Sequence, residues 1–488
     1  MKLVMSKYFF ILLFFLAAFF ATYKLTESPP VWYDEGIIVQ PAINLVRLGV
    51  AKVQLAPDEL ISPSFVTVGY PLVYPLSLVF SHFGISVLSA RALMAVFILL
   101  LVLASYFFIR SVFGPTSGVY ATLLLVGFAP LYGNGKTVLG EVPGLFMLLL
   151  FLFFIHKIEI GNNHRVYFLL AGLAGGLCVA TKPIFIVLMP ALAIAVIVKR
   201  KHLPLNTKSL LLFLFALLLP ILLWVKIQFL AGDTVRQVLQ YYANPYGYGG
   251  QSIIHLVSSN VQRFFKEITP FYLLSLVLTW LISIFIRVRK VSDRFNLTAV
   301  SLVETISFIF TILILLAYVR TAGWYRYLFP AQILALLFFP SSLASGWNYI
   351  KNKINIKAKY AARAPFVVLI LLAIFHFYQV GFNSWVASYY DSHKTQVLIS
   401  YFAQFKKDKT VFIYDAPEIV AFLPDNNYYQ YLQTVDTMRF GEDQLVKINQ
   451  GIPDIIIINP RRQISSSVDF SYYQQKENLN SYLLFERK

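Results

Sequence analysis

Long apolar runs constrain this chain more than any other feature of its sequence. Eleven runs approach the length of about 20 apolar residues that a helix needs to cross a bilayer. Hydrophobic residues make up 58% of the chain and charged residues 13%, which is not the balance of an ordinary soluble domain. The sequence therefore predicts a polytopic α-helical membrane protein, with spans near residues 8–23, 87–109, 115–131, 141–156, 166–181, 184–198, 209–229, 269–286, 298–318, 327–346 and 365–381.

Basic residues predict the orientation of these spans. The first run follows two lysines and has no small-residue cleavage site after it, so we interpret it as a retained signal anchor with a cytoplasmic N-terminus. Alternate loops then fall on the cytoplasmic side, and with Lys2 and Lys7 they carry 18 of the 30 Lys and Arg residues in residues 1–390. Cytoplasmic loops of membrane proteins are enriched in Lys and Arg. We therefore expect an integral plasma (inner) membrane protein whose C-terminal domain lies on the outer side.

The formal net charge of +18 does not indicate a nucleic-acid partner. Residues 391–488 contain 11 Lys and Arg against 12 acids, so the positive excess belongs to the membrane part. There it is neither clustered in one arm nor interleaved with exposed aromatic residues, as binding to nucleic acid requires. The single cysteine, Cys178, excludes disulfide bonds within the chain and a Cys-based metal site.

Acidic side chains gather on the predicted outer side. Asp34 and Glu35 follow the first span, near the start of a long outer loop over residues 24–86. The apolar spacing of "PAINLVRLG" after them predicts a helix along the membrane surface, which fixes both carboxylates there. A short outer turn adds Lys136 and Glu141, the latter at the start of the fourth span.

Cations and aromatic residues are expected at the same depth. The turn "VRTAGWYRYLFP" and the triplet "TKP" supply Arg320, Trp324, Tyr325, Arg326 and Lys182. Arg and Lys at the level of the lipid headgroups suit a lipid phosphate whose tail stays in the bilayer. A carboxylate within hydrogen-bonding reach of a hydroxyl can remove its proton as the hydroxyl attacks. One base and one phosphate-binding group suffice for transfer from a phosphate leaving group, whereas glycosidases need two paired carboxylates.

Five segments, in chain order, carry a resemblance to a known family. They are "WYDEGIIVQPAINLVRLG" at 32–49, "YPLVYPLSLVFSHFGISVLSARALMAVF" at 70–97, "GKTVLGEVPGLFMLLLF" at 135–151, "AGLAGGLCVATKP" at 171–183 and "RYLFPAQILALL" at 326–337. Together they resemble the GT-C glycosyltransferases, and most closely glycosyltransferase family 39. That family includes protein O-mannosyltransferases and the bacterial aminoarabinose transferase of lipid A. The likeness covers roughly residues 1–345.

The resemblance implies an activity and assigns three acids. Members of this group use a polyprenyl-phosphate sugar as donor and transfer the sugar on the outer face with inversion at the anomeric carbon. By position, Asp34 matches the acid proposed as base, and Glu35 matches its neighbour. Glu141 matches the acid of the second outer loop, where many relatives have Asp.

The resemblance leaves the phosphate-binding cation open. Arg91 matches an arginine that opens the second span, and Arg326 belongs to an "RY..P" element. Many relatives have Lys or His just before the Pro-Leu of the first loop, whereas Gly69 and Tyr70 stand there in this chain. The candidates for the phosphate ligand are therefore Arg320, Arg326, Lys182 and Lys136.

Purely structural roles are alternatives for several of these residues. Asp34 and Glu141 could each cap the helix that follows. Arg320 and Arg326 could be interfacial anchors beside Trp324 and Tyr325. Arg91 could pair with an acid or a loop carbonyl rather than contact substrate.

A bound metal is a further alternative. A divalent cation could bind His82 or His255 together with an outer acid. The His and Glu spacing typical of a metal site does not occur in the sequence. We therefore assign no metal ligands and no other cofactor.

Residues 386–488 have the composition of a small soluble domain, and we place the transmembrane domain at residues 1–385. Strands are predicted at 410–415 and 453–460, helices at 416–423 and 441–450, and a third strand at 481–487. Alternating strands and helices predict a small α/β domain with a parallel sheet on the outer face. No glycine-rich turn follows either of the first two strands, so no nucleotide site is predicted.

The function predicted from these observations is an inverting membrane glycosyltransferase. In this hypothesis Asp34 is the base, Glu35 and Glu141 position the acceptor or the base, and the cations hold the donor phosphate. The expected partners are a polyprenyl-phosphate sugar, membrane lipid and a glycan, lipid or protein acceptor. Two alternatives stay open. One is a transporter or flippase of lipid-linked sugars, which is typically built from internal repeats and broken helices. The other is a polymerase or ligase with a lipid-diphosphate oligosaccharide donor.

Overall fold

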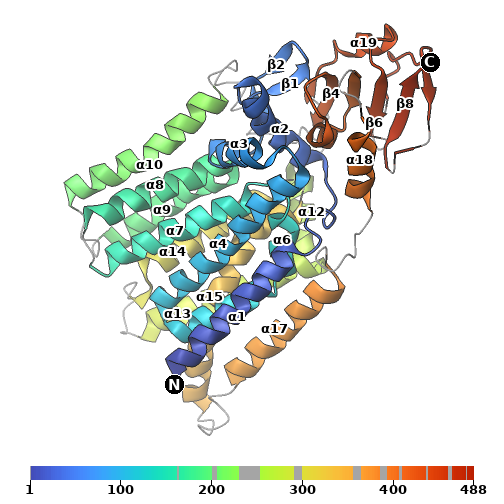
Figure 1. The fold of residues 1–488 in the computed structure, drawn as a ribbon. Coiled ribbons are helices and arrows are strands. Elements are labelled where there is room, and N and C mark those ends of the chain that lie inside the picture. Colours follow the sequence, from blue (N-terminus) through green and yellow to red (C-terminus); the bar gives the residue numbers. More distant parts are fainter. Residues whose placement is uncertain are drawn as a thin grey trace.

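Apolar helices form a bundle, and a small sheet domain sits at one end of it (Figure 1). The structure is a computed structural model. It describes residues 2–161, 164–200, 206–229, 253–290, 299–321, 323–354, 364–384, 393–405, 409–435, 438–459, 464–476, 478–479 and 481–488. Asp233, an acid of the predicted outer side, lies outside the described residues, as do residues 385–392, so the predicted domain boundary stays a prediction.

Six helices are long and apolar enough to span a membrane. They are α4 (Val87–Phe113), α7 (Glu141–Glu159), α10 (Thr207–Gln228), α13 (Ile268–Lys290), α15 (Phe329–Ile354) and α17 (Ala364–Phe382). A seventh span is formed if α5 (Pro115–Val126) and α6 (Ala129–Gly135), bent by 63°, count as one. Helices can cross lipid because they satisfy their own backbone hydrogen bonds.

The remaining predicted spans are helical but shorter. They are the apolar part of α1 (Lys2–Thr22), α8 (Arg165–Thr181), η2 (Pro183–Val187) with α9 (Leu188–Lys199), and α14 (Leu302–Tyr318). Each is an apolar helix of 10–17 residues in the described part of the chain. The chain is thus a polytopic helical membrane protein with six or seven candidate spans, and the predicted total of eleven stays a prediction.

Small residues let two of these helices approach closely. A Cβ atom added at Gly172 of α8 would lie 2.4 Å from the carbonyl oxygen of Phe213 in α10. One added at Gly176 would lie 2.3 Å from the carbonyl oxygen of Leu217. Such small-residue stripes are typical of helix pairs in membranes, where dispersion rather than the hydrophobic effect drives packing.

The first loop folds onto the end of the bundle that carries the sheet domain. It contains α2 (Tyr33–Leu48), the hairpin of β1 (Val53–Ala56) and β2 (Glu59–Ile61), η1 (Pro63–Phe65) and α3 (Tyr70–Phe83). The predicted helix after Asp34 is confirmed, and it ends at Gly49, whose φ of 73° suits glycine. The helix is nevertheless not simply laid on the surface, because ten of its residues are buried between the bundle and the sheet domain.

The C-terminal domain is a mixed rather than a parallel sheet. Its elements are α18 (Lys394–Ala403), β3 (Val411–Tyr414), η6 (Pro417–Phe422), β4 (Tyr428–Val435), β5 (Met438–Phe440), α19 (Leu445–Asn449), β6 (Ile455–Ile458), β7 (Tyr473–Gln475) and β8 (Leu483–Arg487). The strand order is β5-β4-β3-β6-β8-β7. Only the central β4, β3 and β6 are parallel, and the outer pairs are antiparallel. The prediction of a parallel sheet is wrong because β5, β7 and β8 each pair antiparallel with their neighbours.

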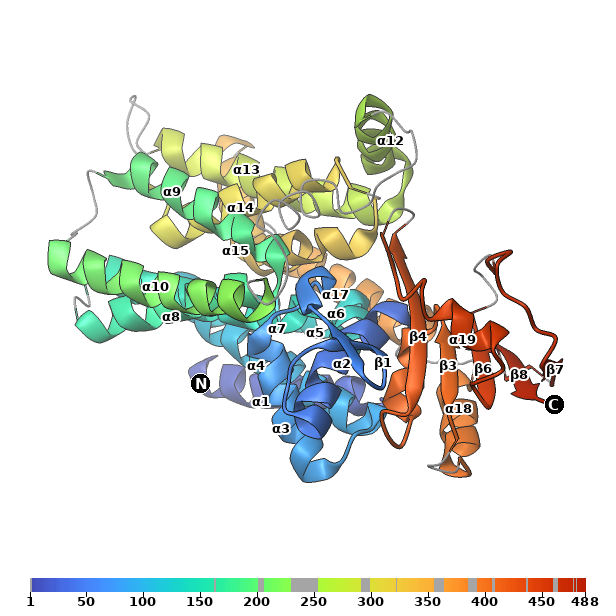
Figure 2. The same ribbon diagram turned by 90° about the horizontal axis from the view of Figure 1, so that it is seen from above.

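The sheet domain is joined to the first loop by close backbone approach and by buried amides. A Cβ atom at Gly36 of α2 would lie 2.1 Å from the backbone nitrogen of Glu418 in η6. The amide of Gln430 in β4 donates to Gln40 in α2 at 2.9 Å. Figure 2 shows β4 beside α2 and β1, with the rest of the sheet extending away from the bundle. The domain therefore covers the loop that carries Asp34 and Glu35.

Candidate active site

The acid pair lies in the first turn of α2. The helix begins after Trp32, whose side chain makes no capping hydrogen bond, so Asp34 and Glu35 do not cap it. Successive residues of a helix are turned by about 100° from one another, and the two carboxylates therefore face different surroundings. The alternative that Asp34 is only a helix cap has no support in this geometry.

Asp34 meets Arg326, which is one of the predicted cations. Nη1 of Arg326 donates to Oδ2 of Asp34, from the short helix η5 (Tyr325–Leu328). The guanidinium carbon lies 4.5 Å from the centroid of the Trp324 ring and 5.4 Å from those of Trp32 and Tyr327. Aromatic faces attract a guanidinium. The side chain of Asp34 remains 30% exposed, so its carboxylate is open to a ligand.

Glu35 is engaged in a buried ion pair with Arg91 in α4. Nε and Nη2 of Arg91 donate to the two carboxylate oxygens at 2.9 and 2.7 Å, and Nη1 donates to the carbonyls of Leu25 and Pro29. The backbone nitrogen of Val138 donates to Oε1 of Glu35 at 3.2 Å. Both side chains are 4% exposed or less. This pair joins three segments of the fold and leaves Glu35 little capacity for substrate.

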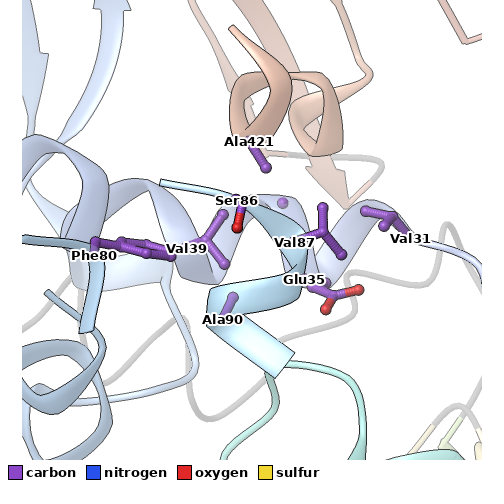
Figure 3. A pocket seen from close by; sticks show the side chains of 9 residues that line it. Val31, Glu35, Val39, Phe80, Ser86, Val87, Ala90 and Ala421 are labelled. Carbon is purple, nitrogen blue, oxygen red and sulfur yellow. The ribbon is translucent and has the colours of Figure 1, made fainter. Parts of the chain in front are cut away.

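Apolar side chains surround the part of the Glu35 side chain that is nearest to the backbone. They line a cavity of about 10 Å³ between α2, α3, α4 and η6, made by Val31, Val39, Phe80, Val87, Ala90 and Ala421 together with Gly36 and Ser86. Figure 3 shows the carboxylate of Glu35 turned away from Val39 and Phe80. The cavity is too small for a sugar.

Glu141 forms the third ion pair, with Lys182. Nζ of Lys182 donates to Oε1 of Glu141 at 2.5 Å, and both side chains are 7% exposed or less. Oε2 of Glu141 is buried and has no hydrogen-bond partner in the described residues. Glu141 follows the N-cap Gly140 at the start of α7, so it is not the N-cap itself.

The Lys182 pair lies beside the Asp34 pair. Burial lowers the pKa of Lys182, and the carboxylate of Glu141 opposes this shift. The next charges that act on this ammonium are those of Arg326 and Asp34. Two cations and two carboxylates thus form one cluster at the end of the helix bundle that faces the sheet domain. We call Asp34, Arg326, Glu141 and Lys182 the four-charge cluster.

Two of the predicted phosphate ligands are not brought into this cluster. Lys136 is fully buried, and its Nζ donates to the carbonyl of Tyr23 at 2.6 Å. Burial and then the charge of Arg91 lower the pKa of Lys136 to about 7. Arg320 is exposed and forms no ion pair within the described residues, which fits the alternative of an interfacial anchor. Arg326 and Lys182 are therefore the cations that the fold places at Asp34.

The turn before Arg326 is held by a helix that sequence reasoning missed. In α12 (Ile253–Lys266), Asn260 donates to the carbonyls of Val319 and Thr321 at 3.2 and 2.8 Å. The hydroxyl of Tyr325 donates to Glu267, which directly follows α12. The helical repeat of apolar residues in 253–268 was the available signal for this element.

Metal ligands do not converge in the part of the chain that the structure describes. No group of three or more His, Cys, Asp or Glu side chains there could hold an ion. His82, one of the two predicted alternatives, contacts the carbonyl of Leu78 in its own helix through Nδ1.

Known proteins share this architecture. Residues 71–224 match the model of the family described as dolichyl-phosphate-mannose-protein mannosyltransferase. The fold matches ArnT from Cupriavidus metallidurans in the apo state, with a TM-score of 0.61 and 13% identity over 99% of this chain and 97% of that one. The chain therefore has the fold of the GT-C glycosyltransferases. The resemblance inferred from the sequence is thereby confirmed, and the transporter alternative is not supported.

Two further structures resemble this chain. ArnT from Cupriavidus metallidurans bound to undecaprenyl phosphate matches with a TM-score of 0.57, 13% identity, and coverage of 99% of this chain and 97% of that one. An Archaeoglobus fulgidus oligosaccharyltransferase in complex with zinc and sulfate matches with a TM-score of 0.52, 13% identity, and coverage of 92% and 68%. At this identity the likeness is one of fold. No curated protein matches the chain in sequence.

Proposed function

We propose that this protein is a glycosyltransferase that moves a sugar from a polyprenyl-phosphate donor to an acceptor hydroxyl or amine at the membrane surface beneath the sheet domain. The matching family is described by a dolichyl-phosphate sugar donor, and the similar ArnT structure holds undecaprenyl phosphate. Both lipids are monophosphates. This supports a monophosphate donor over the lipid-diphosphate alternative.

The observation that carries the proposal is the exposure of Asp34. Its side chain is 30% exposed, against 4% for Glu35 and 1% for Glu141. Among the three acids, only Asp34 is therefore open to an acceptor. As a base, its carboxylate takes the acceptor proton while the acceptor atom attacks the anomeric carbon. The bond from that carbon to the phosphate oxygen breaks, and the lipid phosphate leaves with the bonding electrons, which inverts the anomeric centre.

The donor phosphate would bind between Arg326 and Lys182. Both cations are already paired with carboxylates, so the cluster is close to neutral before the donor arrives. A phosphate that accepts from the Arg326 fork competes with Asp34 for the same donors. Donor binding would thus free the Asp34 carboxylate for the acceptor and strengthen the electrostatic stabilisation of the departing phosphate.

Glu35 and Glu141 have positioning roles in this proposal. Glu35 fixes the first turn of α2 through Arg91, which sets the direction of Asp34. Glu141 orients Lys182 through its Oε1 oxygen. Trp324 and Tyr325 support the turn that delivers Arg326.

The site is proposed to face the outside of the plasma membrane. The N-terminus, which the basic residues predict to be cytoplasmic, lies at the bundle end opposite to the sheet domain (Figure 1). The four-charge cluster and the sheet domain share the other end. The acceptor, whether a glycan, a lipid or a protein, would therefore be reached on the outer face.

The test is the release of free polyprenyl phosphate by purified protein in detergent. A panel of polyprenyl-phosphate sugars is supplied with an acceptor-rich membrane extract. We expect Asp34→Asn to lower release about 100-fold to 10,000-fold, the range for loss of a general base, while donor binding is kept or strengthened. The matched control is Asp58→Asn, which changes an exposed acid of the same loop and should leave release unchanged. Near-normal turnover in Asp34→Asn would remove Asp34 from the mechanism.

A further inference from the structure

The helix α12 presents three different faces. One face, with Asn260, Arg263 and Phe264, lies against the protein. A second face is apolar and open, with Ile254 81% exposed and Phe265 72% exposed. Side chains of a helix repeat every 3.6 residues, so the third face collects the exposed polar residues, namely His255, Ser259, Gln262 and Lys266.

These three faces fit a helix that lies in the surface of a bilayer. A helix on the water-facing surface of a soluble protein rarely exposes three large apolar side chains along one side, as α12 does with Ile254, Val261 and Phe265. Directly after α12, Ile268 is 83% exposed and opens the membrane span α13. The apolar face is thus continuous with the lipid-facing surface of a span. Figure 2 shows α12 at the edge of the bundle. In this position the apolar face of α12 contacts lipid, the polar face contacts water, and the remaining face contacts the protein.

The protein-facing side of α12 is hydrogen-bonded to the turn that leads to Arg326. Arg263 donates to the carbonyl of Gly323, and it also donates to Glu267 at 2.8 Å. Its guanidinium carbon lies 4.8 Å from the centroid of the Tyr325 ring. Tyr325 is the residue before Arg326. The contacts of Arg263 therefore end one residue away from the cation that pairs with Asp34.

We infer that α12 is an interfacial helix whose apolar face is inserted in the lipid and whose Asn260 and Arg263 hold the 319–325 turn so that Arg326 faces Asp34. Arg263 is a positioning residue in this inference and does not contact substrate. The part concerning Arg326 rests on the proposed function, whereas the lipid contact does not. The bilayer surface itself then contributes to the geometry of the active site.

The lipid contact is tested with a fluorophore on a single introduced cysteine. The only native cysteine, Cys178, is fully buried, so it gives little background. Protein labelled at Phe265→Cys or at Gln262→Cys is reconstituted in phosphatidylcholine vesicles with or without brominated acyl chains. We expect brominated lipid to quench the probe at position 265 and to leave the probe at 262 largely unquenched. Equal quenching at both positions, or none at 265, would overturn the interfacial placement whatever the enzyme transfers.

The positioning role is tested by steady-state kinetics in the same vesicles. Arg263→Ala is expected to raise the KM for the donor about 10-fold to 100-fold, the range for a displaced site group, with the KM for the acceptor unchanged. Arg263→Lys keeps the charge opposite Glu267 and should recover part of this loss. The control is Lys266→Ala on the polar face, which should behave like wild type. Folded Arg263→Ala protein with an unchanged donor KM would refute the positioning role, whereas an inactive wild type with quenching at 265 would refute only the proposed function.

Discussion

Each of three carboxylates near the membrane surface meets a different cation, and burial separates their roles. Asp34 is paired with Arg326 and remains partly exposed. Glu35 with Arg91 and Glu141 with Lys182 are buried. A buried carboxylate that has lost its partner is costly because its charge cannot be solvated. The exposed acid is suited to chemistry, and the buried acids are suited to holding the structure.

The first prediction at the residue scale concerns Arg91. Arg91→Met leaves Glu35 as an unpaired buried acid and also removes the donors to the carbonyls of Leu25 and Pro29. We expect a loss of about 3–5 kcal/mol in the free energy of unfolding, measured by denaturation in detergent micelles. As a control, Arg439→Met removes an exposed pair with Glu442 and should change stability little. An Arg91→Met protein of wild-type stability would show that the pair is not structural.

The pH dependence of stability is predicted from Lys136. Burial, and then the charge of Arg91, lower the pKa of Lys136 to about 7 in the folded protein, against an ordinary value of 10.5 for a lysine. Between these two values the unfolded chain binds a proton that the folded chain does not. The free energy of unfolding contributed by this group therefore rises with pH from about 7 to about 10. Lys136→Met should lack this rise in thermal melts across that range, and parallel curves for both proteins would show that Lys136 stays charged when folded.

At the scale of elements, the contact between α2 and η6 determines how the sheet domain covers the site. Gly36→Ala places a methyl group 2.1 Å from the backbone nitrogen of Glu418, so one element must move. We expect a loss of about 1–3 kcal/mol in stability, typical of overpacking, together with reduced transfer because Asp34 lies two residues away. Gly346→Ala in α15 is the control, since nothing lies within 4 Å of its added Cβ. Equal thermal stability of both variants would show that the close approach is not maintained in solution.

At the scale of the whole molecule, the sheet domain and the four-charge cluster share one end of the bundle. One measurement of orientation therefore determines on which side of the membrane both of them lie. The proposed orientation predicts that an impermeant thiol reagent added to intact cells labels Ser466→Cys in the sheet domain. It should not label Thr207→Cys at the opposite end of α10. Both positions are exposed, and native Cys178 is buried. Labelling of Thr207→Cys alone would reverse the orientation and place the active site in the cytoplasm.

Features that depend on local sequence could be predicted. The eleven apolar runs are helical in the described residues, with a 63° bend in the run at 115–131, because lipid requires a backbone that satisfies its own hydrogen bonds. The helix after Asp34, the strands at 411–414 and 455–458, and the GT-C-like fold were also predicted from the residues. These features can be predicted because periodicity and hydropathy are patterns among residues that are close together in the sequence.

Features that depend on distant partners required the tertiary structure. Arg320 and Arg326 have the same side chain and are near neighbours in sequence. Only Arg326 reaches Asp34, which lies 292 positions earlier in the chain. Glu35 was expected to act beside Asp34, but packing of α4 gives it to Arg91, 56 positions away. Strand β4 was missed because its pairing is decided by β3 and β5. The sequence by itself determined which residues could carry charge to the membrane surface. Only the fold determined which cation each acid meets, because charges of one sign are chemically alike until packing fixes their distances.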